Sequence, residues 1–172
     1  MLFRSWLNGQ YIARMEIADL AAAVAPLFAD AGLAVPSDDE WFQKLLGLLR
    51  PRAKRLTEFI DLARPFVEDA VQYEPDAVKK HLADPGLGAH VEALAAALRA
   101  TDPFTESVVE ETLRRIAGER QVKAGALIHA TRVAVTGRTA SPGIFEVLVL
   151  LGRDRTVRRL ERLVEFLSGP RS

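Results

Sequence analysis

Three side chains that could bind an anion or a nucleotide base lie close together in the sequence: Arg132, Arg138 and Ser141. They belong to the segment from His129 to Gly152, which reads HATRVAVTGRTASPGIFEVLVLLG. We expect a short turn, residues 136–143, between two packed helices. Such a turn would expose backbone N–H groups, one hydroxyl and two guanidinium groups, which are donors suited to phosphate oxygens and base edges.

The two helices that would position this turn are marked by glycine, serine and proline. Gly137 is expected to end the first helix, because glycine adopts the backbone conformation found just past a helix C-terminus. Ser141 can cap the second helix, with Pro142 at its first position, where the missing N–H would have had no partner. Gly152 is expected to close that helix. Apolar residues recur at helical spacing and predict its buried face: Ile144, Val147, Leu148 and Leu151.

A second group of basic residues surrounds Pro51. We call it the basic cluster, and its members are Arg50, Arg52, Lys54 and Arg55. Pro51 fits the first turn of a new helix, and cations at a helix start oppose the helix dipole, which favours an anionic partner. The alternative is a set of ion pairs with Glu58, Asp61 or the acidic residues 38–40, and the sequence leaves both open.

Other arginines have ordinary structural explanations. Arg114 and Arg115 lie toward the end of a predicted helix, where cations are favoured. The closing helix, 154–167, is expected to carry four arginines on its outer face: Arg155, Arg158, Arg159 and Arg162. Such a stripe could hold phosphates, but we interpret it as a solvated face paired with acidic neighbours.

Composition predicts a helical protein. Alanine, leucine, arginine and glutamate dominate, and 49% of the 172 residues are hydrophobic. The chain has no cysteine, which excludes disulfides and zinc–thiolate sites. No apolar run approaches a membrane span and the N-terminus does not resemble a signal peptide, so we expect a cytoplasmic protein with no membrane partner.

Charge is distributed unevenly although the formal net charge is zero. Residues 1–111 hold 11 Lys/Arg and 18 Asp/Glu, a balance of −7, whereas residues 112–172 hold 12 and 5, a balance of +7. Such asymmetry hints at a polyanion that binds one half. Phosphate-loop, dinucleotide and HExxH motifs are absent from the sequence, and its three histidines are scattered, so we expect no metal site and no independent catalysis.

The helical periodicity predicts an all-α fold of two small helical bundles. Helices are expected over 3–14 and 16–31, and another is expected to start at Asp38 with Ser37 as its cap. The Pro- and acid-rich stretch 64–84 contains one short helix, 75–82, and is the predicted boundary. The predicted subdomains are therefore 1–72 and 85–172, with residues 73–84 as a linker.

Three segments resemble bacterial glutamyl-tRNA synthetases, in family order. ATRVAVTGRTASPGIFEVLVLLGRD resembles the C-terminal end of that family, WLNGQYI its entry into the anticodon-binding half, and LLRPRAKRLTEF a segment between them. The resemblance spans nearly the whole chain. The HIGH-like and KLSKR-like signatures of the family's ATP site are absent, so the resemblance is to the anticodon-binding half alone.

The resemblance implies specific roles. Arg52 falls where a family arginine reads the third anticodon base and prefers C over G. Arg132, Ser141, Pro142 and Ile144, with Arg114 nearby, would form the pocket for the first two bases, with Pro142 and Ile144 as an apolar surface for a splayed base. Phosphate contacts would come from Arg50, Lys54, Arg55 and Arg138.

The resemblance also implies partners. These are tRNA(Glu) and a catalytic half of the same enzyme, which would bind ATP and Mg; this chain itself would bind no cofactor, act as a monomer and be inactive alone. The alternative is a stand-alone helical module that binds RNA or a protein and has no role in aminoacylation.

Overall fold

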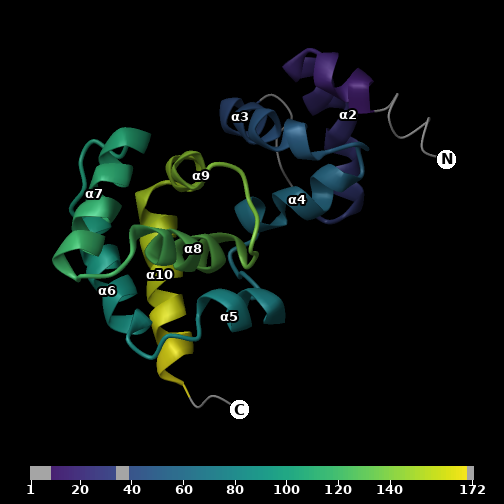
Figure 1. The fold of residues 1–172 in the computed structure, drawn as a ribbon. Coiled ribbons are helices and arrows are strands. Elements are labelled where there is room, and N and C mark those ends of the chain that lie inside the picture. The colour runs from purple at the N-terminus through teal and green to yellow at the C-terminus, as the bar shows by residue number, and fades with distance from the viewer. Residues whose placement is uncertain (1–8, 34–38, 170–172) are drawn as a thin grey trace. The chain divides into compact units, whose positions relative to one another are not determined.

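The computed structural model describes residues 9–33 and 39–169, and all regular elements in these ranges are helices (Figure 1). This confirms the all-α prediction. The chain divides into two compact units, Met1–Asp69 and Ala70–Ser172, which we call the first and second unit. Residues 9–14 are helical, and the rest of the helix expected over 3–14 lies outside the described residues.

The first unit is built from α2 (Ile17–Asp30), α3 (Glu40–Leu49), the 3-10 helix η1 (Arg50–Arg52) and α4 (Glu58–Val67). Its core is apolar and aromatic, and Phe28 meets Phe42 edge-on with ring centroids 5.2 Å apart. The N-cap of α3 is Asp39, whose carboxylate accepts a hydrogen bond from the Phe42 N–H at 3.0 Å. The cap expected at Ser37 lies outside the described residues.

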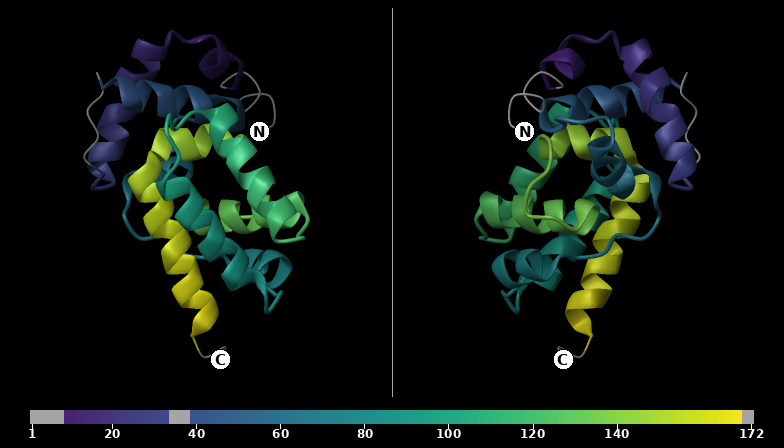
Figure 2. Two further views of the ribbon diagram at one scale, coloured as in Figure 1. Left: turned by 90° about the vertical axis from the view of Figure 1, so that its left-hand side faces the viewer. Right: turned by 90° about the vertical axis from the view of Figure 1, so that its right-hand side faces the viewer.

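The second unit holds six helices: α5 (Pro75–His81), α6 (Leu87–Arg99), α7 (Glu106–Glu119), α8 (Ala124–Thr136), α9 (Ile144–Leu151) and α10 (Arg153–Ser168). Helix α8 is central, since each of the other five packs against it. The longest helix, α10, lies alongside α6 (yellow and teal in Figure 2). The segment expected as a linker, 73–84, contains α5, which packs on α8.

The prediction that Arg159 lies on the outer face of the closing helix was wrong. Its side chain is 1% exposed, and its Nη1 donates a hydrogen bond to the Val135 carbonyl at 2.6 Å. Packing of α10 against α8 turns this position inward, so the guanidinium satisfies one of the last carbonyls of α8, which have no partner within their own helix. The exposed basic face of α10 is therefore narrower than the helical period suggested, with Arg158 and Arg162 exposed and Arg155 half-buried.

Within the ranges that the structure describes, no helix combines the length and the apolarity needed to cross a lipid bilayer.

Candidate nucleic-acid interface

The turn between α8 and α9 begins at Gly137, as the sequence predicted. Gly137 has φ 75°, in the left-handed region, and its N–H bonds the Val133 carbonyl at 2.8 Å. Its own carbonyl accepts from the Glu74 N–H at 2.9 Å, just before α5. A Cβ at this position would lie 2.0 Å from the Gln72 carbonyl oxygen. Only glycine fits, because the conformation is left-handed and the segment leading into α5 passes directly against the backbone.

Ser141 does not cap the second helix, and this prediction was wrong. Helix α9 begins at Ile144, its N-cap is Gly143, and no side chain bonds the cap. The Ser141 hydroxyl instead accepts a hydrogen bond from Arg132 Nε at 3.0 Å and donates one to the Pro142 carbonyl at 2.9 Å. Since a bond to a charged donor is stronger than a neutral cap, the hydroxyl is drawn across the turn toward α8.

Arg132 is therefore held at the centre of the predicted site. Besides its bond to Ser141, its Nη1 lies 3.2 Å from His129 Nδ1, one helical turn earlier on α8. The His129 ring stacks on His81, at the end of α5, with centroids 4.5 Å apart and planes inclined by 13°. Burial lowers the pKa of His81, and the neighbouring His129, Lys80 and Arg132 lower it further.

The histidine pair is a feature that the sequence analysis assigned no role. His129 and Arg132 are three residues apart in a helix, so their proximity could have been inferred from spacing alone. The partner His81 could not, because it is 48 positions away from His129 and only the packing of α5 on α8 brings it there.

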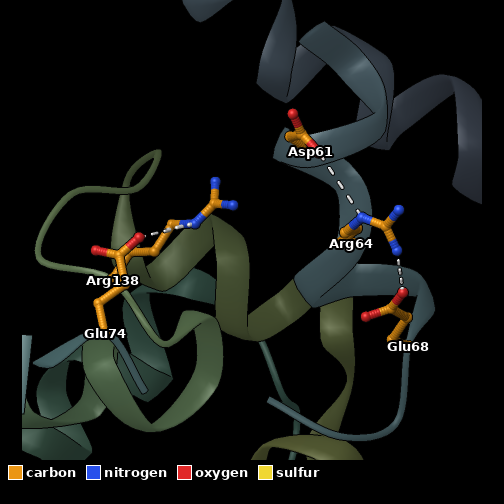
Figure 3. Close-up of polar contacts among 5 residues, drawn as sticks. All are labelled: Asp61, Arg64, Glu68, Glu74 and Arg138. Carbon is orange, nitrogen blue, oxygen red and sulfur yellow. Dashed lines mark hydrogen bonds and ion pairs between the residues drawn. The ribbon is translucent and has the colours of Figure 1, made fainter. Parts of the chain in front are cut away.

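Arg138 lies in the same turn but faces an acidic partner. Its Nε is 3.6 Å from a Glu74 carboxylate oxygen, and its side chain is 33% exposed (Figure 3). Its backbone N–H bonds the Thr136 hydroxyl at 3.3 Å. A phosphate that binds Arg138 would have to compete with the Glu74 carboxylate for its guanidinium.

Pro142 and Ile144 are buried, Ile144 with 4% exposure. The apolar contact with a splayed base that the resemblance implied would require that one of them become accessible, and it stays a prediction.

Arg114 lies on α7 and contacts Glu110, one turn earlier, with Nη2 at 2.6 Å from the carboxylate. This is its polar partner within the described part of the chain, and the structure does not join it to Arg132 or Ser141. Its predicted role beside the anticodon stays a prediction.

The basic cluster of the first unit does not open a helix. Arg50 and Arg52 belong to η1, directly after the end of α3, and α4 begins only at Glu58. The argument that these cations oppose a helix dipole is therefore wrong, because a positive charge just past the C-terminus of α3 is favourable.

Two of the acidic residues proposed as partners of the basic cluster make contacts outside its charged groups. Glu58 accepts from the Lys54 backbone N–H at 2.7 Å, and Asp61 pairs with Arg64, which also bonds Glu68 at 2.5 Å (Figure 3). The side chains of the cluster are largely exposed, with Arg50 half-buried.

A metal centre finds no support in the described ranges, which contain no group of three or more His, Cys, Asp or Glu side chains placed to hold an ion. The candidate arginines of the two units, in contrast, are each exposed or half-buried. Guanidinium groups present only donors, in a planar arrangement that suits phosphates and the acceptor edges of bases.

Comparison with known proteins gives one consistent result. A model of a family described as the anticodon binding domain matches residues 17–164. Glutamate–tRNA ligase 1 of Syntrophomonas wolfei is 35% identical over 164 residues, which are 95% of this chain and 33% of that protein. The glutamate–tRNA ligase of a Roseiflexus species is 38% identical over 160 residues, 90% of this chain and 32% of that protein.

The fold is shared with a crystal structure of a glutamate tRNA ligase from Elizabethkingia meningosepticum in complex with its amino acid. The TM-score is 0.85 at 21% identity, over 95% of this chain and 32% of that chain. This chain therefore spans about a third of the length of the proteins it matches. With residues 17–164 matched, the chain belongs to the anticodon-binding domain family.

Proposed function

We propose that this chain binds the anticodon of tRNA(Glu) as the anticodon-binding part of a glutamate–tRNA ligase. The observation that carries the proposal is the Arg132 guanidinium, fixed by Ser141 at 3.0 Å and His129 at 3.2 Å beside the turn of an anticodon-binding domain. A guanidinium already held by its own protein loses little freedom on binding, so it is preorganised for a base edge.

The joining of glutamate to tRNA would then belong to a part of the enzyme outside this chain, which spans about a third of its relatives. ATP and Mg²⁺ would bind that part. This chain would contribute selection of the tRNA and would bind no cofactor.

Arg52 is the proposed reader of the third anticodon base. It is exposed in η1 within the basic cluster. Its guanidinium can donate to the O2 and N3 acceptors of cytosine, whereas the Watson–Crick edge of guanine offers donors at N1 and N2 and would leave the N–H groups mismatched. Neighbouring Arg50, Lys54 and Arg55 would hold phosphates and add affinity without reading sequence.

The test compares binding of this chain to tRNA(Glu) and to the same tRNA with the third anticodon base changed from C to G, at two salt concentrations. We expect a preference for C of roughly tenfold, as one good base contact contributes about 1–3 kcal/mol. Arg52→Gln should abolish the preference. Arg64→Gln removes the same charge from the same unit, at a residue bound by Asp61 and Glu68, and should leave the preference intact.

A second function, a helical module that binds protein, is favoured by one observation: Arg114 and Arg138 already face carboxylates. The salt dependence separates the two, because phosphate contacts release counterions and give a steep loss of affinity with salt. Equal binding of both tRNAs with a steep salt dependence would leave only a nonspecific basic surface. No binding to either tRNA would favour the protein-binding module.

A further inference from the structure

Four side chains from three segments form a continuous row in the second unit. His81 stacks on His129, His129 contacts Arg132, and Arg132 donates to Ser141. The row joins the end of α5, the last turns of α8 and the turn that follows. The proposed function uses Arg132 with its contacts to Ser141 and His129, and it assigns no role to the stack of His129 on His81.

The contact between His129 and Arg132 assigns the role of one imidazole nitrogen. A guanidinium carries donors and no acceptor, so at 3.2 Å the Nδ1 of His129 is the acceptor. In this contact the ring N–H of His129 is on Nε2.

The stack holds the His129 ring in this orientation. Near-parallel planes, 13° apart, leave the ring little freedom to rotate away from Arg132. Helix α5 is in turn fixed to the turn by the bond from the Glu74 N–H to the Gly137 carbonyl at 2.9 Å. The end of α5 is thus joined to α8 by the histidine stack, and the segment before α5 is joined to the turn after α8 by a backbone hydrogen bond.

We infer that His129 is a positioning residue: stacked on His81, it holds the Arg132 guanidinium toward the anticodon through its Nδ1 acceptor. The inference rests on the proposed function, in which Arg132 contacts the bases of the anticodon. It makes reading of the bases at this turn, as distinct from total affinity for RNA, dependent on the Nδ1 acceptor of His129.

Base discrimination is therefore the decisive readout. Loss of the fixed guanidinium should weaken selection of the base, while nonspecific phosphate contacts elsewhere on the chain are retained. We would measure binding of this chain and of its variants to tRNA(Glu) and to the same tRNA with the second anticodon base changed from U to C.

Two variants of one residue separate positioning from packing. His129→Phe keeps an aromatic ring for the stack but has no acceptor, and its preference between the two tRNAs should be about tenfold lower than that of the wild-type protein. His129→Asn keeps a carbonyl acceptor close to the place of Nδ1, so it should retain the preference. The control is His90→Phe, because His90 accepts from Arg120 at 3.4 Å on another face of the unit.

A second measurement does not need RNA. Imidazole ¹⁵N shifts of the free protein should show His129 with its proton on Nε2, and Arg132→Gln should change those shifts while Arg120→Gln should not. An Nδ1 proton on His129 at neutral pH would overturn the inference. So would a His129→Phe variant that discriminates as well as the wild-type protein. If the wild-type chain shows no base preference although the ¹⁵N shifts are as expected, the proposed function fails, and the inference fails with it.

Discussion

Replacement of Gly137 by alanine should destabilise the second unit more than any other single added methyl group on its glycines. Gly137 has φ 75°, and a Cβ there would lie 2.0 Å from the Gln72 carbonyl oxygen and 3.1 Å from Val71 Cγ1. The obstacle is backbone and not the end of a flexible side chain, so relief requires the segment before α5 to move.

The magnitude follows from three costs. The left-handed conformation costs an alanine about 1–2 kcal/mol. Displacing the segment breaks the bond from the Glu74 N–H to the Gly137 carbonyl, which contributes about 0.5–1.5 kcal/mol. Forcing an extra methyl group into a filled site costs about 1–3 kcal/mol. Gly137→Ala should therefore lower the free energy of unfolding by about 2.5–6.5 kcal/mol, a large part of the roughly 5–15 kcal/mol of a typical domain.

The matched control is Gly125→Ala, in the first turn of the same helix. A Cβ at Gly125 meets nothing within 4 Å, and the residue is exposed. Because alanine has a higher helix propensity than glycine, this variant should be more stable by about 0.5–1 kcal/mol. The same chemical change should thus have opposite signs at the two ends of α8.

The assay is urea unfolding followed by far-ultraviolet circular dichroism. Both tryptophans, Trp6 and Trp41, precede Asp69 and belong to the first unit, so tryptophan fluorescence in the same samples reports on that unit. A shifted dichroism transition with an unchanged fluorescence transition would assign the loss to the second unit. If Gly137→Ala unfolds at the wild-type urea concentration, or if Gly125→Ala loses as much as Gly137→Ala, the steric reasoning is wrong.

Three further predictions concern single side chains. Arg159→Met should lower the free energy of unfolding in urea by about 1–3 kcal/mol, because it leaves the buried Val135 carbonyl without its donor at 2.6 Å; unchanged stability would contradict that role. Arg114→Ala should change stability by about 0.5 kcal/mol or less, since its pair with Glu110 is an exposed contact within one helix, so a loss of tRNA affinity measured by filter binding would report an RNA contact. Because the pKa of folded His81 is lowered, the unfolded chain takes up the proton first, and thermal unfolding should show stability falling as the pH drops below about 6.5; His81→Phe should flatten this dependence, and a wild-type profile in that variant would assign it elsewhere.

Helix ends that depend on a single residue type were predictable from the sequence. Gly137 ends α8 and Gly152 ends α9, because both positions adopt positive φ, which glycine alone tolerates without strain. The cap expected at Ser141 failed for the converse reason. A hydroxyl can serve several acceptors and donors, and which one it meets depends on what packs nearby, here Arg132 from the preceding helix.

Arginine roles were the least predictable part of the site. The helical period placed Arg159 on a solvated face, but α10 packs against α8 and buries it. Two other arginines expected near the anticodon, Arg114 and Arg138, turned out to face Glu110 and Glu74. A long, flexible arginine side chain has many partners within reach, so sequence spacing narrows the set of possible partners but does not identify the one that is contacted.

The sequence by itself determined the helices, the all-α class and the resemblance to an anticodon-binding region, since these depend on periodicity and on motifs read along the chain. Only the tertiary structure decided how the candidate site is held together. His81 reaches His129 because α5 packs on α8, and Ser141 reaches Arg132 because the turn folds back across its own helix. Contacts between residues far apart in sequence arise from packing, which no local pattern records, and in this protein those contacts orient the arginine on which the proposed function depends.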